Sequence, residues 1–421
     1  MSTCSYGPIL AIAAMISGTA MAQTTGFQYI GTLGGRGQEV AVPFAIGPGP
    51  VVVGANDYFH SSGYFRRAFV WTPDSGLNSL ANTPSSGTSS GAYAISADGS
   101  IVVGVLGVAP GSSGPGAQVF RRVNAGADEI LPLALGMFFP NVAAISADGT
   151  TTVGTVNGYG GGGQAVTWVG VGVATILPTL PGAPSAQAYG VNADGSVVVG
   201  SSGRGYPYDN TPVRWVNGQV ESLGLPPGCN WAWARAVSAD GNTVVGLGWV
   251  TGGSSRAFKW TPQTGMTILE SGPTGFGEAW SISDDARFIG GRVGAHSTVW
   301  RDAVPFDVES QLLPAGTILS PFTGLAGNLL ISHDGTTVAG CERVAEAAGD
   351  AEYHPWVAVL PDWFTRTCHA DFNRDNAVDF FDYDDFVGAF ETGASTADFD
   401  GDASVDFFDY DAFVTAFELG C

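Results

Sequence analysis

Short apolar runs on either side of an Asp-Gly pair recur along most of the chain. The repeated unit reads Ala-x-x-(Ile/Val)-(Ser/Asn)-x-Asp-Gly-x-x-Val-x-Gly, and its copies lie at 92–104, 143–154, 188–200, 234–246, 279–291 and 329–340, with a degenerate copy at 42–54. The glycines that close the units are Gly54, Gly104, Gly154, Gly200, Gly246, Gly290 and Gly340, which are 50, 50, 46, 46, 44 and 50 residues apart. Because Asp-Gly between two apolar runs is a strong hairpin signal, each copy predicts two paired strands.

Two further apolar runs follow each hairpin. The first ends in Trp at 67–72, 165–168, 212–215, 256–261 and 297–300, whereas the second unit has QVFR at 118–121 and lacks the Trp. The second run holds Leu or Ile after a turn, as at 76–80 and 265–269. Four short strands in 40–50 residues are typical of a propeller blade, so the fold class predicted is all-β, a seven-bladed β-propeller of four-stranded blades. A β-solenoid or a pair of β-sandwiches is the alternative.

The N-terminal end of the repeat region predicts how the ring closes. Residues 27–35, FQYIGTLGG, read as a fourth strand that precedes the first hairpin. Such a strand would complete the last blade and remove an open sheet edge.

Several of these segments resemble the extracellular HAF repeat. The resemblance rests on TLGGRGQEVAVPFAIGPGPVVVG (32–54), RAFVWTPDSGLNSL (67–80) and RAFKWTPQTGMTIL (256–269), and it covers about 27–360. It implies a secreted bacterial protein without an established enzymatic role.

The repeated polar residues have a structural interpretation. Asp tolerates turns and bonds its own backbone, so the Asp-Gly aspartates are expected to form turns rather than active sites: Asp98, Asp148, Asp194, Asp240 and Asp334. The repeated Trp is expected in the core. Up-and-down strands would place the longer, variable loops at the opposite end, with aromatic side chains that could stack on sugar rings: Tyr206, Tyr208, Trp231 and Trp233. No catalytic motif is present, and the five histidines are scattered.

Composition narrows the classes of partner and the compartment. The 421 residues include 38 acidic and 16 basic side chains, a net charge of −22 that argues against nucleic acid and anionic membranes as partners. Residues 1–22, with an apolar stretch and Ala-Met-Ala before Gln23, predict a signal peptide, and no later stretch is long enough to span a membrane. We therefore expect a secreted or cell-surface protein with a propeller at 23–360, a linker at 361–367 and a module at 368–421.

The C-terminal module carries a duplicated pattern of calcium ligands. Residues 370–393 and 397–420 match at 17 of 24 positions, and residues 368–421 hold 14 of the 38 acidic side chains. Each copy opens with a twelve-residue loop whose oxygen-bearing positions suit two Ca²⁺ ions. The expected ligands are Asp371, Asn373, Asp375, Ala377, Asp379 and Asp382 in the first loop, and Asp398, Asp400, Asp402, Ser404, Asp406 and Asp409 in the second.

A helical period follows each loop. Tyr383, Phe386, Val387 and Phe390 are spaced like Tyr410, Phe413, Val414 and Phe417, which predicts two helices packed on each other.

The module resembles a dockerin, and its Leu-Gly-Cys ending is similar to the GC-type dockerin-like domain of bacterial surface proteins. The resemblance implies EF-hand-type calcium loops and a cohesin-like or other cell-surface protein as partner. Cys368 and Cys421 bracket the module and would clasp its ends, while Cys229 and Cys341 would have to pair across blades.

Taken together, the expected protein is a non-enzymatic binding or surface-display protein, assembled through calcium. The propeller would bind a ligand, a glycan being one candidate. The alternative is a polysaccharide-active hydrolase or lyase that its dockerin delivers, and a pair of carboxylates or a His-Tyr pair at the propeller mouth would favour it.

Overall fold

The protein is described from a computed structural model. It describes residues 27–33, 39–60, 63–80, 89–108, 116–124, 126–157, 162–204, 209–269, 271, 275–309, 329–345, 351–361, 364, 370, 372, 378–399 and 404–419. The chain divides into two compact units, Met1–Val359 and Leu360–Cys421. The predicted signal at 1–22 lies outside the described residues.

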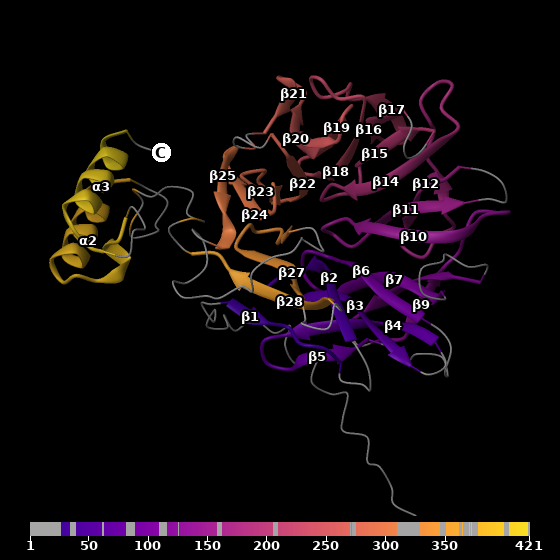
Figure 1. Cartoon of the computed structure of the whole chain (residues 1–421), viewed down its shortest axis with the longest axis horizontal. Coiled ribbons are helices and arrows are strands. Elements are labelled where there is room, and N and C mark those ends of the chain that lie inside the picture. Colours follow the sequence, from indigo (N-terminus) through magenta and orange to yellow (C-terminus); the bar gives the residue numbers. More distant parts are fainter. Residues whose placement is uncertain are drawn as a thin grey trace, which may run out of the picture. The chain divides into compact units, whose positions relative to one another are not determined.

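The first unit is a seven-bladed propeller of four-stranded antiparallel sheets, as predicted (Figure 1). The first three blades are β2 (Glu39–Ile46), β3 (Val52–His60), β4 (Gly63–Thr72) and β5 (Gly76–Ser79); β6 (Ser89–Ile95), β7 (Ile101–Val108), β8 (Gln118–Val123) and β9 (Asp128–Leu131); and β10 (Phe138–Ile145), β11 (Thr151–Asn157), β12 (Gln164–Val169) and β13 (Thr175–Ile176). The next three are β14 (Ser185–Val191), β15 (Val197–Gly203), β16 (Asn210–Val216) and β17 (Gln219–Ser222); β18 (Trp231–Val237), β19 (Val244–Val250), β20 (Ser254–Thr261) and β21 (Gly265–Ile268); and β22 (Gly277–Ile282), β23 (Phe288–Val293), β24 (His296–Arg301) and β25 (Val304–Asp307).

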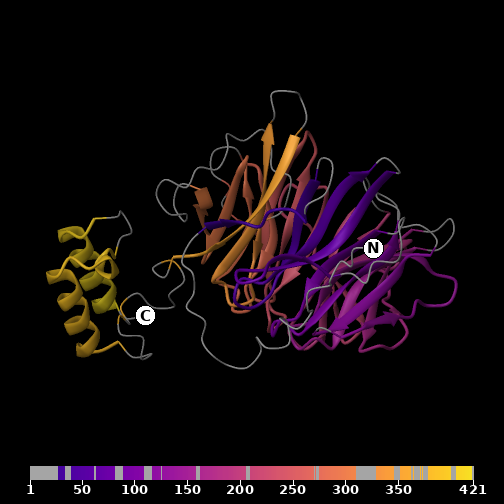
Figure 2. The same ribbon diagram turned by 90° about the horizontal axis from the view of Figure 1, so that it is seen from below.

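The seventh blade joins the two ends of the unit. Its strands are β26 (Leu330–Ile331), β27 (Thr337–Ala345), β28 (Ala351–Val359) and, outermost, β1 (Phe27–Tyr29). Phe27 pairs with Ala358 and Tyr29 with Trp356, so indigo β1 lies beside orange β28 (Figures 1 and 2). The predicted closure by the N-terminal strand is confirmed.

The Asp-Gly hairpins are held by closely similar hydrogen bonds, with Asn192 in place of the turn serine in the fourth blade. In the second blade, Asp98 Oδ1 accepts from the Ser100 N–H at 2.9 Å and from Ser96 Oγ at 2.6 Å, and Ser96 Oγ accepts from the Ile101 N–H at 3.0 Å. The motif's Ser-x-Asp-Gly is therefore a turn that bonds itself, as expected from the residue types.

The glycine that closes each motif sits against the backbone of the neighbouring strand. A Cβ on Gly200 would lie 1.9 Å from the Gln187 carbonyl oxygen, and the same 2.0 Å approach occurs at Gly154 and Gly246. In the sixth unit the residue in this position is Gly291, whose Cβ would lie 2.0 Å from Glu278 O. The assignment of Gly290 as the closing glycine was therefore wrong by one residue.

The repeated tryptophans fasten neighbouring blades. Trp168 and Trp215 are fully buried, and their Nε1 atoms donate to Pro132 O at 2.9 Å and Pro178 O at 2.7 Å, each in the preceding blade. In the second blade Arg122 occupies the Trp position, donates to Leu80 O and pairs with Asp128 at 2.7 Å. The tryptophans are core residues, as predicted.

Among its described residues, the second unit has two helices, α2 (Phe380–Glu391) and α3 (Phe407–Leu419), and a 3₁₀ turn, η4 (Ser395–Ala397). The helices pack through related residues, because the Phe386 and Phe413 rings stack at 4.0 Å and the Tyr383 and Tyr410 hydroxyls lie 2.7 Å apart. The predicted helical faces are those that meet.

Within the part of the chain that the structure describes, no helix is both long and apolar enough to cross a membrane. Cys229 and Cys341 are not joined by a disulfide, and burial raises the pKa of the Cys229 thiol. The predicted clasp between Cys368 and Cys421 lies outside the described residues.

Candidate functional site at the central channel

A channel of about 180 Å³ runs between the innermost strands of all seven blades. Six of these strands carry a β-bulge at the same motif position, where one residue has no partner on the second strand. These bulged residues all line the channel: Phe44, Tyr93, Ala143, Tyr189, Arg235 and Trp280. A bulge turns its extra residue out of the regular alternation, which explains why these side chains point inward rather than into the sheet interfaces.

One wall of the channel carries a cation among aromatic rings. The Arg235 guanidinium carbon lies 4.4 Å from the centre of the Tyr189 ring, 4.8 Å from Trp233 and 4.5 Å from Trp280. Burial lowers the pKa of Arg235, while Tyr189 and Glu278 act in the opposite direction. Burial also raises the pKa of Tyr189.

At the Asp-Gly end the channel opens into a second cavity of about 350 Å³. Three residues that precede a turn aspartate line this cavity: Ala97, Asp284 and His333. Backbone hydrogen bonds link the corresponding positions of neighbouring blades, including Ala97 N to Ala147 O at 3.1 Å and Ala239 N to Asp284 O at 3.0 Å. Four blades have Ala at this position. The sixth and seventh have Asp284 and His333 instead.

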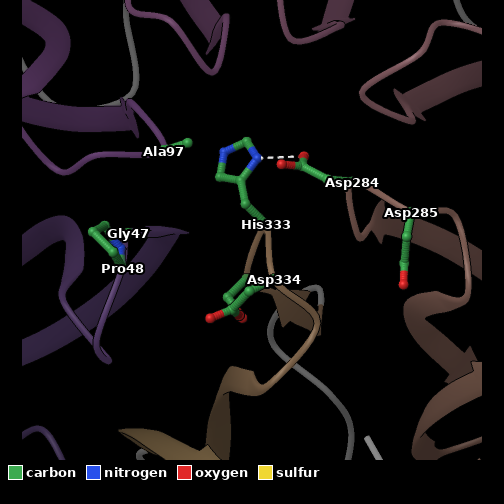
Figure 3. Close-up of a pocket in the computed structure, with 8 residues that line it drawn as sticks. Gly47, Pro48, Ala97, Asp284, Asp285, His333 and Asp334 are labelled. Atoms are coloured by element: carbon green, nitrogen blue, oxygen red, sulfur yellow. Dashed lines mark hydrogen bonds and ion pairs between the residues drawn. The ribbon is translucent and has the colours of Figure 1, made fainter. Parts of the chain in front are cut away.

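Asp284 and His333 form a polar pair in this second cavity, which we call the mouth of the channel. His333 Nδ1 lies 2.8 Å from Asp284 Oδ1, both side chains are partly exposed, and Figure 3 shows them turned toward each other. Asp285 and Asp334 also line the cavity but point away from His333 (Figure 3), and each accepts a hydrogen bond from its own turn serine, Ser283 at 2.6 Å and Ser332 at 2.5 Å. His333 lines both cavities, so the pair lies where the mouth meets the channel.

The turn aspartates are structural rather than chemical groups. Burial opposes the charge of Asp98 and Asp148, but hydrogen bonds from Ser96 and Ser100, and from Ser146 and Thr150, outweigh it and hold the pKa of both below the usual range. The same direction holds for Asp194 and Asp240.

The predicted sugar-stacking residues are only partly described. Tyr206 and Tyr208 lie outside the described residues. Trp231 and Trp233 belong to strand β18 rather than to the preceding loop. Trp231 is buried and stacks on Trp249 with ring centres 5.6 Å apart, whereas Trp233 is half-buried and flanks Arg235. A glycan site at these residues stays a prediction.

Of the twelve predicted calcium ligands, the structure describes six. Asp371, Asn373, Asp375, Ala377, Asp400 and Asp402 lie outside the described residues. Those described are Asp379, Asp382, Asp398, Ser404, Asp406 and Asp409. Among the described residues alone, no three His, Cys, Asp or Glu side chains are placed to hold a metal.

The described ligands nevertheless suit a hard cation. Asp382 and Asp409 are the last residues of the two twelve-residue loops, and both carboxylates are completely buried. Asp409 accepts backbone N–H groups from Phe399 at 2.6 Å and Asp406 at 2.8 Å, which leaves further carboxylate lone pairs for an ion.

Sequence reasoning missed the residues that line the channel. The signal lay in the motif itself, because the variable position after the first Ala carries large aromatics and one Arg between small or aliphatic neighbours. The Asp284–His333 pair could likewise have been found as the two departures from Ala before the turn aspartate.

Comparisons with known proteins leave the family open. No protein-family model matches the chain, and no curated protein matches its sequence. The structure is similar to TolB from Acinetobacter baumannii (14% identity, 64% of each chain covered, TM-score 0.40) and to the β-propeller domain of the Trilobed protease from Pyrococcus furiosus (10% identity, 77% of this chain and 96% of that one, TM-score 0.47). It is also similar to a prolyl endopeptidase (14% identity, 77% of this chain and 51% of that one, TM-score 0.49).

The chain spans less than two thirds of the TolB chain and about half of the prolyl endopeptidase. The assignment of the propeller therefore rests on the strand pairing described above. The resemblances to HAF repeats and dockerins stay predictions.

Proposed function

We propose that this chain is a secreted, non-enzymatic binding protein that attaches to a cell-surface partner through a calcium-dependent, dockerin-like C-terminal module. The propeller would present the ligand-binding channel, and the module would hold the protein in place.

The observation that carries the attachment role is the matched burial of Asp382 and Asp409. Both carboxylates are completely buried, 27 residues apart, at the starts of two helices that pack through equivalent rings. Backbone N–H groups already compensate part of this burial, since Asp382 accepts from Asp379 at 2.9 Å and Asp409 accepts from Phe399 and Asp406. A Ca²⁺ ion in each loop would add the positive charge that these hydrogen bonds do not supply. The loop carboxylates would hold the ion, and the ion would order the loop at the start of each helix.

The same duplication supports a protein partner. Phe380, Phe381, Phe407 and Phe408 are 67–69% exposed, although they begin helices whose other aromatics form a core. Exposed pairs of large aromatic residues are typical of interaction surfaces, because a bound partner would remove their apolar area from water.

Calcium calorimetry on the full-length chain tests the proposal. We expect heat from two binding events and loss of that heat when Asp382→Asn and Asp409→Asn are combined. The matched control, Asp148→Asn with Asp240→Asn, removes the same charge from propeller turns and should titrate like the wild type. A wild-type chain that gives no heat with Ca²⁺ would contradict the attachment role.

The Asp284–His333 pair favours a second candidate, a polysaccharide-active enzyme. A carboxylate within 2.8 Å of an imidazole nitrogen can orient the ring so that the other nitrogen accepts a proton. The other mouth carboxylates, Asp285 and Asp334, are engaged in their turns, so a second proton-transferring group is not evident among the described residues of the mouth.

A reducing-end assay across neutral and acidic polysaccharides distinguishes the two candidates. Release of sugar ends by the wild type but not by His333→Ala would support the enzyme. Equal release by both proteins, or none, would favour the binding role.

A further inference from the structure

Arg235 stands apart from other arginines of the propeller. Arg66, Arg122, Arg214 and Arg292 each lie within 2.9 Å of a carboxylate oxygen: Asp57, Asp128, Glu221 and Glu278, respectively. No carboxylate among the described residues forms an ion pair with Arg235, and its Nε atom is buried without a hydrogen-bond partner there.

The acidic side chain whose charge acts on Arg235, Glu278, is already engaged. Glu278 is buried, accepts from Arg292 Nε and Nη2 at 2.8 Å and from Ser255 Oγ at 3.0 Å. Its charge acts on Arg235 only at longer range. A buried cation without a close counterion is costly, so a group that supplies the missing negative charge would bind favourably.

Three aromatic rings surround the Arg235 cation. Tyr189, Trp233 and Trp280 lie against the guanidinium at 4.4–4.8 Å, the distance range of cation–π contacts. Aromatic rings do not accept the strong hydrogen bonds that a guanidinium offers, and its N–H fork matches the two oxygens of a carboxylate. Because Arg235 is a bulged residue that lines the channel, a ligand in the cavity would lie next to its side chain.

The other walls suit the body of an organic molecule. Phe44 and Tyr93 contribute rings whose centres lie 4.9 Å apart, and Ala143 leaves space where neighbouring blades carry larger side chains. The cavity of about 180 Å³ limits the ligand to roughly the size of one sugar or one aromatic acid.

We propose that the central channel binds a small organic carboxylate, with Arg235 as the partner of the acid group and the surrounding rings as the partner of its planar or apolar body. The proposal concerns the propeller alone, so its failure would leave the calcium-dependent attachment untouched.

Intrinsic fluorescence of the full-length chain tests it, because Trp233 and Trp280 flank Arg235. The probes are D-glucuronate and benzoate, each with its neutral counterpart, glucose or benzamide, and sodium sulfate as an inorganic anion. At least one of the two acids is expected to change the emission saturably at millimolar concentration, while its neutral counterpart does not. Which acid binds distinguishes a sugar acid from an aromatic acid.

Variants locate the site. Arg235→Met should weaken binding of the acid at least tenfold, about 1.4 kcal/mol, and Arg235→Lys should weaken it less, because it keeps the charge but loses the planar fork. Arg214→Met is the matched control, since Arg214 also stacks on a tryptophan, Trp260, at 4.7 Å but outside the channel. It should bind like the wild type.

A second variant guards against misfolding of Arg235→Met. Ala143→Phe fills the channel with a residue that the first blade carries at the same position, and it should abolish binding without lowering the melting temperature. The proposal is overturned if neither acid binds the wild type, if each neutral counterpart or sulfate binds as well as the acid, or if Arg235→Met or Ala143→Phe binds it unchanged.

Discussion

The hairpin turns of the blades require a residue with a positive φ directly after the turn aspartate. Six blades use Ser-x-Asp-Gly or a close variant, and the Gly of the second blade, Gly99, has a φ of 74°. The sixth blade has Ala286 in that position, with a φ of 62°. Because an L-residue with a Cβ is strained in this region, the sixth turn stores a local cost that the others avoid.

Ala286→Gly should therefore stabilise the propeller. We expect a gain of about 1 kcal/mol, since the relief of left-handed strain exceeds the added chain entropy of Gly. Urea denaturation followed by tryptophan fluorescence measures it. The mirror variant Gly99→Ala should lose a comparable amount, and a destabilised Ala286→Gly would contradict the explanation.

The turn aspartates predict an acid-dependent stability. Since the folded-state pKa of Asp148 lies below its unfolded value, its contribution is fully present above the unfolded pKa and is lost as pH falls through the folded one. Asp148→Asn should thus melt below the wild type at neutral pH, and the gap should narrow below about pH 4. Melting temperatures from pH 7 to pH 3 check this, and a constant gap would rule it out.

At the scale of elements, the sequence predicted strands and hairpins well and channel residues poorly. Period-two alternation and Asp-Gly turns are local signals, so the blades and the closing strand β1 could be placed from residues alone. The direction of Arg235 could not, because the bulge between Ala234 and Ala236 breaks the alternation on which such a prediction depends. Asp284 and His333 meet only because the sixth and seventh inner strands are neighbours in the ring.

The closing strand β1 is expected to stabilise the whole ring. Removal of residues 1–29 would expose the hydrogen-bonding edge of β28 and uncover the Trp356 ring, whose centre lies 5.7 Å from that of Phe27. We expect a loss of about 2 kcal/mol or more in the free energy of unfolding and self-association on gel filtration.

The control for this truncation is a chain that lacks only residues 1–22, the predicted signal. It keeps β1 and should unfold at the same urea concentration as the complete chain. If both truncated chains behave alike, β1 does not close the ring in solution.

At the scale of the molecule, two compact units with separate cores share one chain. The propeller core is divided among blade interfaces, whereas the helical unit is built on Phe386 and Phe413. If the C-terminal loops bind Ca²⁺, the ion should stabilise one unit only, since it binds the folded form of that unit alone.

Calorimetry of the full-length chain should accordingly show two unfolding transitions. Saturating Ca²⁺ at about 100 times the dissociation constant should add roughly 2.7 kcal/mol to the helical unit for each bound ion, and it should leave the propeller transition in place. Asp409→Asn should reduce the shift, and EDTA should remove it. Movement of the propeller transition would show that the units are energetically coupled.

The pairing of Tyr29 with Trp356 sets an order of events during synthesis. A chain that emerges N-terminus first carries β1 for more than 300 residues before its partner strand exists, so six blades can form while the ring is still open. The last blade cannot be completed until nearly the whole propeller has been made, and an interrupted product would keep an unpaired edge. The ring can therefore close only in a chain that has been synthesised as far as β28. Because β1 has only three residues, it offers little edge for pairing with other chains before β28 is made.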